Sequence, residues 1–170
     1  KKITDRTSLK KNRARVLKSN NSYFALHEIA MKEIKERLQD INRKFEKIAI
    51  ITGYPKIWTT HFPDAFFLND SDTLIFESEK YDLIINATSI GISNLEFKLT
   101  NKIIHKNSVC YDMSYGKASN SFEKWATQNN LIFYNGLGML LEQAADAFLI
   151  WESQRPSVTE ELKKILEDNL

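Results

Sequence analysis

The stretch YDLIINATSIG, residues 81–91, decides the fold. Its first part, Asp82 to Asn86, carries three consecutive apolar residues without alternation, which is typical of a strand buried on both faces of a parallel sheet. Small and polar residues follow the strand at once, in the run Asn86 to Gly91. In a parallel sheet, such residues at the carboxyl end of a strand are where ligands bind, so this stretch predicts both the architecture and a candidate site.

Strands of the same kind occur on both sides of this stretch. The sequence predicts them at Ile48–Thr52, Ser108–Asp112 and Leu131–Tyr134, with a further possible strand at Ala65–Leu68. A short helix is expected around Phe122 to Gln128, between two of these strands. Strands separated by helical segments favour βαβ crossovers. We therefore expect an α/β fold, a Rossmann-like parallel sheet with flanking helices in one compact domain.

Three longer helices are predicted outside the strands. A basic arm precedes a helix that starts near Ser22 and ends near Arg43 and Lys44, with apolar residues at spacings of three and four. A helix from Gly138 to about Trp151 is apolar most of the way round, so we expect it to be largely buried. The run Ser157–Glu160 reads as a capping box that begins a last helix with one apolar face.

Composition excludes several classes of protein. The chain has 170 residues, of which 42% are hydrophobic and 27% charged, as in an ordinary globular domain rather than a disordered chain. The single Cys110 excludes an internal disulfide and a cysteine-based zinc site. No stretch approaches the roughly 18 apolar residues of a membrane span, and the lysine-rich start lacks a signal-peptide core. These observations predict a cytoplasmic location.

The net charge of +2 hides an asymmetry. Residues 1–47 hold 14 Lys and Arg against 6 Asp and Glu, whereas the remaining 123 hold 10 against 16. A basic run between Lys10 and Lys18 could contact nucleic acid or anionic lipid. The absence of an accompanying aromatic or glycine pattern favours a solvated arm before the first helix, so nucleic acid is not the partner we expect.

Three small or polar clusters fall at the ends of predicted strands: Asn86–Gly91, Asp112–Lys117 and Asn135–Met139. Each taken singly could be an ordinary loop, but three at one edge favour a binding site. Asp112 could bond a ligand hydroxyl or serve a turn or helix cap. The three histidines, His27, His61 and His105, are read as surface or packing residues, and no metal site is predicted. Cys110 is expected in the core.

The motifs YDLIINATSIGIS, CYDMSYGK and NGLGMLLEQAADAFLIW resemble the carboxyl-terminal, NADP-binding half of shikimate dehydrogenase. The likeness covers about residues 81–170. It implies an NADP-dependent oxidoreductase that interconverts 3-dehydroshikimate and shikimate in aromatic amino acid biosynthesis, and it leaves a homodimer open. By resemblance, the residues beside the cofactor are Asn86, Ala87, Thr88, Ser89, Gly136 and Met139, and those that touch the substrate are Tyr115 and Gln143.

Two features of that family are missing from the chain. Its catalytic lysine and aspartate lie in a domain with an NVTVPxK-type motif, and no such stretch occurs here. Its glycine-rich phosphate loop, GAGGxxR-like, would follow the first strand, where this chain has only Gly53 followed by Tyr54-Pro55-Lys56. We therefore assign no catalytic residue and expect that the chain alone does not complete the hydride transfer.

Residues 1–80 resemble a different family. The segment from Asp5 to Gly53 is similar to the amino-terminal region of S-adenosylmethionine-dependent methyltransferases of the malonyl-carrier-protein methyltransferase and complex I assembly factor type. This resemblance implies S-adenosylmethionine as the alternative cofactor. We hypothesise a composite chain, methyltransferase-like over 1–80 and dehydrogenase-like over 81–170, that together form one Rossmann-like domain. A non-catalytic fragment is the remaining alternative.

Overall fold

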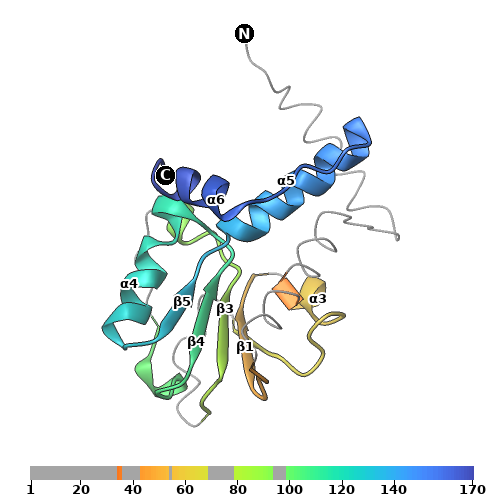
Figure 1. Ribbon diagram of the computed structural model, residues 1–170. Helices are drawn as coiled ribbons and strands as arrows, with labels where there is room; N and C mark the ends of the chain where they lie inside the picture. Colours follow the sequence, from red (N-terminus) through yellow and green to blue (C-terminus); the bar gives the residue numbers. More distant parts are fainter. Residues whose placement is uncertain (1–33, 36–42, 54, 69–78, 94–98) are drawn as a thin grey trace.

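The computed structural model describes residues 34–35, 43–53, 55–68, 79–93 and 99–170. Within these residues, five parallel strands form one sheet in the order β2-β1-β3-β4-β5, with helices on both faces (Figure 1). The predicted Rossmann-like α/β class is confirmed. The strands are β1 (Ile48–Ile51), β2 (Phe66–Leu68), β3 (Leu83–Asn86), β4 (Val109–Asp112) and β5 (Ile132–Tyr134).

All five strands lie where the apolar runs predict them, including the weakly marked segment before Leu68. β3 and β4 are buried at every position, as expected for strands with helices on both faces. They pair in register from Leu83 with Val109 to Asn86 with Asp112, so both strands end on a polar residue at the same level. β1 and β2 precede residue 81; β1 pairs with β2 on one side and with β3 on the other. The sheet is therefore continuous across the predicted junction.

The connections differ greatly in regularity. In the described part of the connection from β1 to β2, the helix is the four-residue α3, whereas the connection from β4 to β5 contains the nine-residue helix α4. Two further helices follow β5 and lie at the carboxyl edge of the sheet (Figure 1). The elements are α3 (Pro55–Trp58), η1 (Gly91–Ser93), η2 (Asn101–Ile103), η3 (Gly116–Ala118), α4 (Asn120–Gln128), α5 (Leu137–Glu152) and α6 (Glu160–Glu167).

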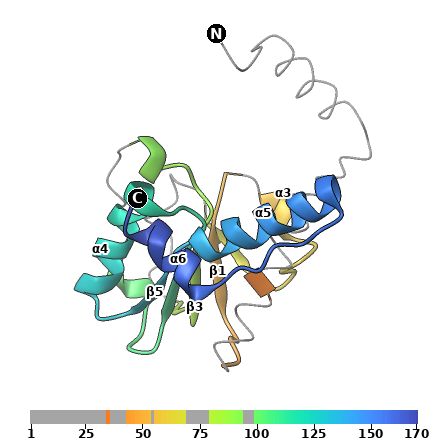
Figure 2. The ribbon, with the colours of Figure 1, turned by 45° about the horizontal axis from the view of Figure 1, so that its top comes forward.

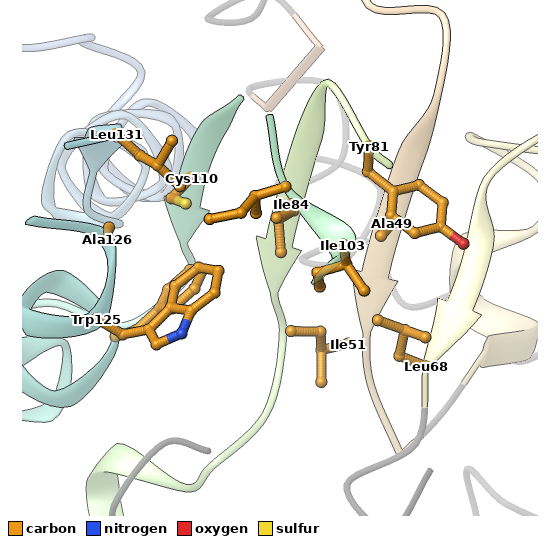
Figure 3. Close-up of a cluster of buried hydrophobic side chains, with 12 residues drawn as sticks. Ala49, Ile51, Leu68, Tyr81, Ile84, Ile103, Cys110, Trp125, Ala126 and Leu131 are labelled. Carbon is orange, nitrogen blue, oxygen red and sulfur yellow. The ribbon is translucent and has the colours of Figure 1, made fainter. Parts of the chain in front are cut away.

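One face of the sheet packs against α4. Phe122 and Trp125 stack with their ring centroids 5.7 Å apart, and the Trp125 indole Nε1 donates to the Leu99 carbonyl at 3.0 Å. Figure 3 shows this cluster, in which Cys110 is fully buried. The predicted core position of Cys110 is confirmed, and burial raises the pKa of its thiol to about 12.

The opposite face is covered by residues from before β1 and from the segment between β1 and β2. Ile34, Trp58 and Phe62 pack there against Ile50 and Leu83. Ile34 and Lys35 are helical, in agreement with the predicted first helix; the rest of that helix up to residue 42, and the basic arm, lie outside the described residues. Both faces of the sheet thus carry an apolar layer, which fixes the strands and leaves their carboxyl ends to form a site.

Two predictions about the carboxyl-terminal helices are wrong. Only the first half of α5 is buried, and Ile150 and Trp151 at its far end are 72% and 76% exposed. The helix runs beyond the sheet (Figures 1 and 2), so in the described structure its apolar end has no sheet to pack against. α6 is capped by Thr159, whose Oγ1 accepts from Leu162 N at 3.2 Å, and not by Ser157.

The apolar stripe of α6 is also open, since the helix has no buried residue. Leu162 and Ile165 are 39% and 53% exposed. No helix among the described residues has the length and apolar character that crossing a membrane requires.

Candidate functional site

The three predicted polar clusters meet at the carboxyl edge of the sheet. β3, β4 and β5 are neighbours, and the chain continues their pairing beyond the strands. Met113 N donates to the Asn86 carbonyl at 3.0 Å, and Gly136 N donates to the Ser114 carbonyl at 2.9 Å. Segments more than twenty residues apart in sequence therefore form one continuous surface, as the sequence predicts.

The Asn86 side chain organises the first cluster. Its Oδ1 accepts from Thr88 N at 3.1 Å and from Thr88 Oγ1 at 2.8 Å, which closes a tight turn after β3. Ala87 N donates to the Ile51 carbonyl at 2.9 Å, so the turn is attached to β1 as well. Ala87 and Thr88 are half-buried and Ser89 is exposed. The Asn86 side chain is 2% exposed, so it holds the turn from below while Ser89 faces outward.

Asp112 is completely buried at the end of β4. Its Oδ1 accepts from Ser114 N at 2.8 Å and its Oδ2 from Asn86 Nδ2 at 3.1 Å. Of the two roles that the sequence left open, the turn is the one the geometry supports, because the buried carboxyl group is not presented to a ligand. Burial raises the pKa of Asp112 to about 6, and the hydrogen bonds from Ser114 and Asn86 partly oppose the rise.

Gly136 is required by packing. It is buried ahead of α5, and a Cβ built on it would lie 2.1 Å from the Met113 carbonyl oxygen. Leu137 N donates to Asn135 Oδ1 at 3.1 Å, which satisfies one amide of the first turn of α5. The absence of a side chain at Gly136 therefore lets the segments after β4 and β5 approach each other.

The other predicted site residues have different surroundings. Met139 is 7% exposed and packs in the apolar layer with Ile85 and Tyr111, so most of its surface belongs to the core. Gln143 lies one turn further along α5 and is half-buried. Tyr115, in the second cluster, is 36% exposed. The structure thus assembles the turns of the site tightly and leaves Tyr115 open to a ligand.

The end of β1 departs from a phosphate-binding loop. The strand order reverses between β1 and β3, which is where open α/β sheets bind their ligands. Thr52 N donates to the Leu68 carbonyl at 2.9 Å, and the four-residue helix α3 begins at Pro55. Gly53 is exposed, and an added Cβ there would meet nothing within 4 Å. The exposed Lys56 is the nearest described cation along the chain after Gly53.

A cleft of about 580 Å³ opens beside this edge, between η3, α4 and the end of the chain. Its polar lining combines Lys117 with the carboxylates of Glu123 and Glu167. The remaining lining residues are Gly116, Ser119, Asn120, Asn135, Leu137 and Leu170. The sequence does not indicate this cleft, because no pattern in it shows that residues 167–170 return to the segment after β4.

The described residue His105 belongs to a cluster away from the candidate site. His105 lies at the opposite end of the sheet, where its Nε2 is 2.9 Å from Asp82 Oδ1. Asp82 Oδ2 accepts from the backbone N–H groups of Glu46 and Lys47, both at 2.9 Å, so this cluster joins three segments. No group of three potential metal ligands occurs among the described residues. His27 lies outside the described residues, and the surface or packing roles expected of the histidines stay predictions.

The role of Asp112 is the feature that sequence reasoning left undecided. A signal was present: β3 and β4 each consist of apolar residues that end on a polar one, Asn86 and Asp112. Strands paired in register bring such residues together, but the register itself is not visible in the sequence.

The fold and this edge define the chain as a Rossmann-like α/β protein with its candidate site at the carboxyl ends of β1, β3, β4 and β5. Similar solved structures include a chorismate mutase/shikimate 5-dehydrogenase fusion protein from Clostridium acetobutylicum, at a TM-score of 0.60 and 20% identity over 83% of this chain and 61% of that one. Another is the shikimate 5-dehydrogenase of Listeria monocytogenes, at a TM-score of 0.58 and 17% identity over 81% and 62%. At these identities the likeness shows the fold.

The sequence itself is similar to shikimate dehydrogenase (NADP+), so the predicted resemblance is confirmed. The enzyme of Vibrio atlanticus strain LGP32 is 42% identical over 94 residues, which are 53% of this chain and 34% of the relative. The enzyme of Legionella pneumophila strain Lens is 40% identical over 126 residues, which are 73% of this chain and 43% of that relative. The chain thus spans less than half the length of these curated relatives. No protein-family model matches it.

The comparisons give no support to the methyltransferase resemblance of residues 1–80. The match to the Legionella enzyme, over 126 residues, is longer than the segment 81–170, so the dehydrogenase likeness extends across the predicted junction. A composite origin of the chain stays a prediction.

Proposed function

We propose that this chain is the cofactor-binding part of an NADP-dependent shikimate dehydrogenase. The observation that carries the proposal is the direct contact of three separate motifs at one sheet edge, through Asn86, Asp112 and Gly136. Those motifs lie in the part of the sequence that resembles the dehydrogenases. 3-Dehydroshikimate and shikimate are the proposed substrates of the whole enzyme.

The residues at this edge fit one half of a dinucleotide better than the other. Thr88 and Ser89 offer hydroxyl groups on the turn that Asn86 holds after β3, and Gly136 keeps the segment before α5 close to the segment after β4. The segment after β1 fits the phosphates of a dinucleotide poorly, because it has one glycine and a four-residue helix in place of a glycine-rich loop. Lys56 is the group that could supply positive charge to phosphates there.

The roles of the chain's own residues follow from this fit. When bound, NADPH supplies the hydride. The turn at Thr88 and Ser89 would orient the cofactor, and α5 would place Met139 and Gln143 beside its reactive end. Tyr115 would contact the substrate. No described residue is assigned the proton transfer, so the chain needs a further catalytic part for turnover.

Calorimetric titration of the purified chain with NADPH tests the proposal, with S-adenosylmethionine as the competing ligand. We expect saturable heat with NADPH and none with S-adenosylmethionine. Thr88→Val should weaken NADPH binding by a factor of about 2–13, the equivalent of one hydrogen bond of about 0.5–1.5 kcal/mol. Thr127→Val, the same substitution at an exposed position of α4, is the matched control and should bind like the wild type.

A second assay addresses turnover. NADPH mixed with 3-dehydroshikimate and the chain should show no enzyme-dependent loss of NADPH absorbance. Sustained turnover would contradict the assignment of no catalytic residue, and binding of S-adenosylmethionine in place of NADPH would contradict the proposed cofactor.

A further inference from the structure

The ends of β3 and β4 are joined by a buried side-chain pair. Asn86 and Asp112 are register partners, with exposed fractions of 2% and 0%. Asn86 Nδ2 donates to Asp112 Oδ2 at 3.1 Å. The other carboxylate oxygen accepts from Ser114 N at 2.8 Å, so both oxygens of Asp112 are used within the protein. Asp112 can therefore affect a bound ligand only through Asn86 and Ser114, the residues to which it is hydrogen-bonded.

The carboxylate dictates which way the Asn86 amide faces. An amide side chain has a donating and an accepting end, whereas an ionised carboxylate only accepts. With Nδ2 directed at Asp112, Oδ1 is left for Thr88, whose N and Oγ1 donate to it at 3.1 and 2.8 Å. Thr88 Oγ1 in turn lies 3.4 Å from Ile90 N. A chain of contacts thus runs from β4 through Asn86 into the turn after β3.

We propose that Asp112 is a positioning residue for the cofactor edge: its ionised carboxyl group fixes the Asn86 amide, and through it the turn at Thr88, in the conformation that binds the dinucleotide. The binding role rests on the proposed function above. The positioning of the turn does not, because it is a property of the chain without ligand.

Protonation of Asp112 should release the turn. A proton on Oδ2 faces the N–H groups of Asn86 Nδ2, so that hydrogen bond is lost or the amide turns over. A reversed amide points Nδ2 at Thr88 N, which then has no acceptor in the turn. Burial raises the pKa of Asp112 to about 6, and the groups that oppose the rise, Ser114 and Asn86, are uncharged. The release is therefore expected within an accessible pH range.

Amide NMR of the chain without ligand tests the positioning. Between pH 8 and pH 5, the signals of Thr88 N–H, Ser114 N–H and Asn86 Nδ2 should shift together, with a common midpoint near 6. Asp112→Asn should abolish this transition. Asp82→Asn is the matched control, because it is the same substitution at the residue that precedes the amino end of β3. This variant should retain the transition.

Two NMR outcomes would overturn the inference. One is a shift at Ser114 without a shift at Thr88, which would confine Asp112 to its own turn. The other is a Thr88 signal that does not titrate in the wild type. The wild-type titration needs no variant, so the test holds even if Asp112→Asn does not fold.

Affinity measurements connect the turn to binding. If only the ionised form binds, a pKa of about 6 leaves about a quarter of the molecules competent at pH 5.5, so the dissociation constant for NADP+ should rise about fourfold relative to pH 8. Titration of the ligand's own phosphate affects the wild type and Asp112→Asn equally. The ratio of the two constants should therefore be about fourfold larger in the wild type than in Asp112→Asn.

Equal ratios in the two proteins would overturn the binding role of Asp112. Absence of NADP+ binding at every pH would instead refute the proposed function, and the NMR titration would then decide the positioning by itself.

Discussion

Replacing Gly136 by alanine tests whether the close approach of the segments after β4 and β5 holds the site together. The added Cβ would lie 2.1 Å from the Met113 carbonyl oxygen, more than 1 Å inside an ordinary contact of about 3.4 Å. The backbone at Gly136, with φ −80° and ψ 1°, is open to alanine, so the cost is steric and not conformational. Because the obstacle is main chain on both sides, one segment must move.

Overpacking of this kind costs about 1–3 kcal/mol. For a domain of this size, the melting temperature should fall by about 2–4 °C for each kcal/mol. Gly53→Ala is the matched control, since its Cβ would meet nothing within 4 Å. Thermal unfolding followed by circular dichroism should show a loss for Gly136→Ala and no loss, or a gain of up to about 1 kcal/mol, for Gly53→Ala.

A Gly136→Ala variant as stable as the wild type would refute the packing argument. So would equal losses in the two variants, because a general cost of removing glycine would then explain both.

Three further predictions concern titratable groups. The pKa of Asp112 is raised from 3.8 to about 6, so the folded state binds more protons between these values. The unfolding free energy of the protein should therefore fall by about 2 kcal/mol as pH rises from 4 to 6. Urea denaturation should show this slope flattened in Asp112→Asn. Asp82 has a lowered pKa: burial opposes the change, and hydrogen bonds from Lys47, Glu46 and His105 outweigh it. Asp82→Asn should therefore lose about 1–3 kcal/mol at pH 7, a loss that shrinks as pH falls below 3.8; an undiminished loss at pH 3 would contradict this. Cys110, buried with a pKa of about 12, should react with a thiol reagent such as DTNB only on unfolding, and rapid labelling of the native chain would refute its placement.

The apolar runs were sufficient to predict the strands. Val109 to Tyr111 and Leu83 to Ile85 are uninterrupted because both faces of the sheet are covered, and that pattern is local to each strand. The polar clusters after them were equally visible, and the parallel arrangement places them at one edge. Which residue of each cluster faces outward was not predictable, because it depends on the partner strand.

The far end of α5 shows the limit of such reasoning. Ile150 and Trp151 carry the apolar pattern of a buried helix, yet they are the most exposed large apolar residues of α5. A hydrophobic pattern indicates that one surface of a helix is apolar, but it does not indicate which part of the protein covers that surface. The helix passes beyond the sheet, and only its position in space reveals this (Figure 2).

By itself, the sequence determined the class of fold, the position of all five described strands and the edge at which polar residues gather, because burial and strand period act locally along the chain. The tertiary structure decided that Asp112 is buried beside Asn86 and that Gly136 lies against the Met113 carbonyl. These features arise from the register of neighbouring strands and from contacts between distant segments, and such contacts are set only when the chain has folded.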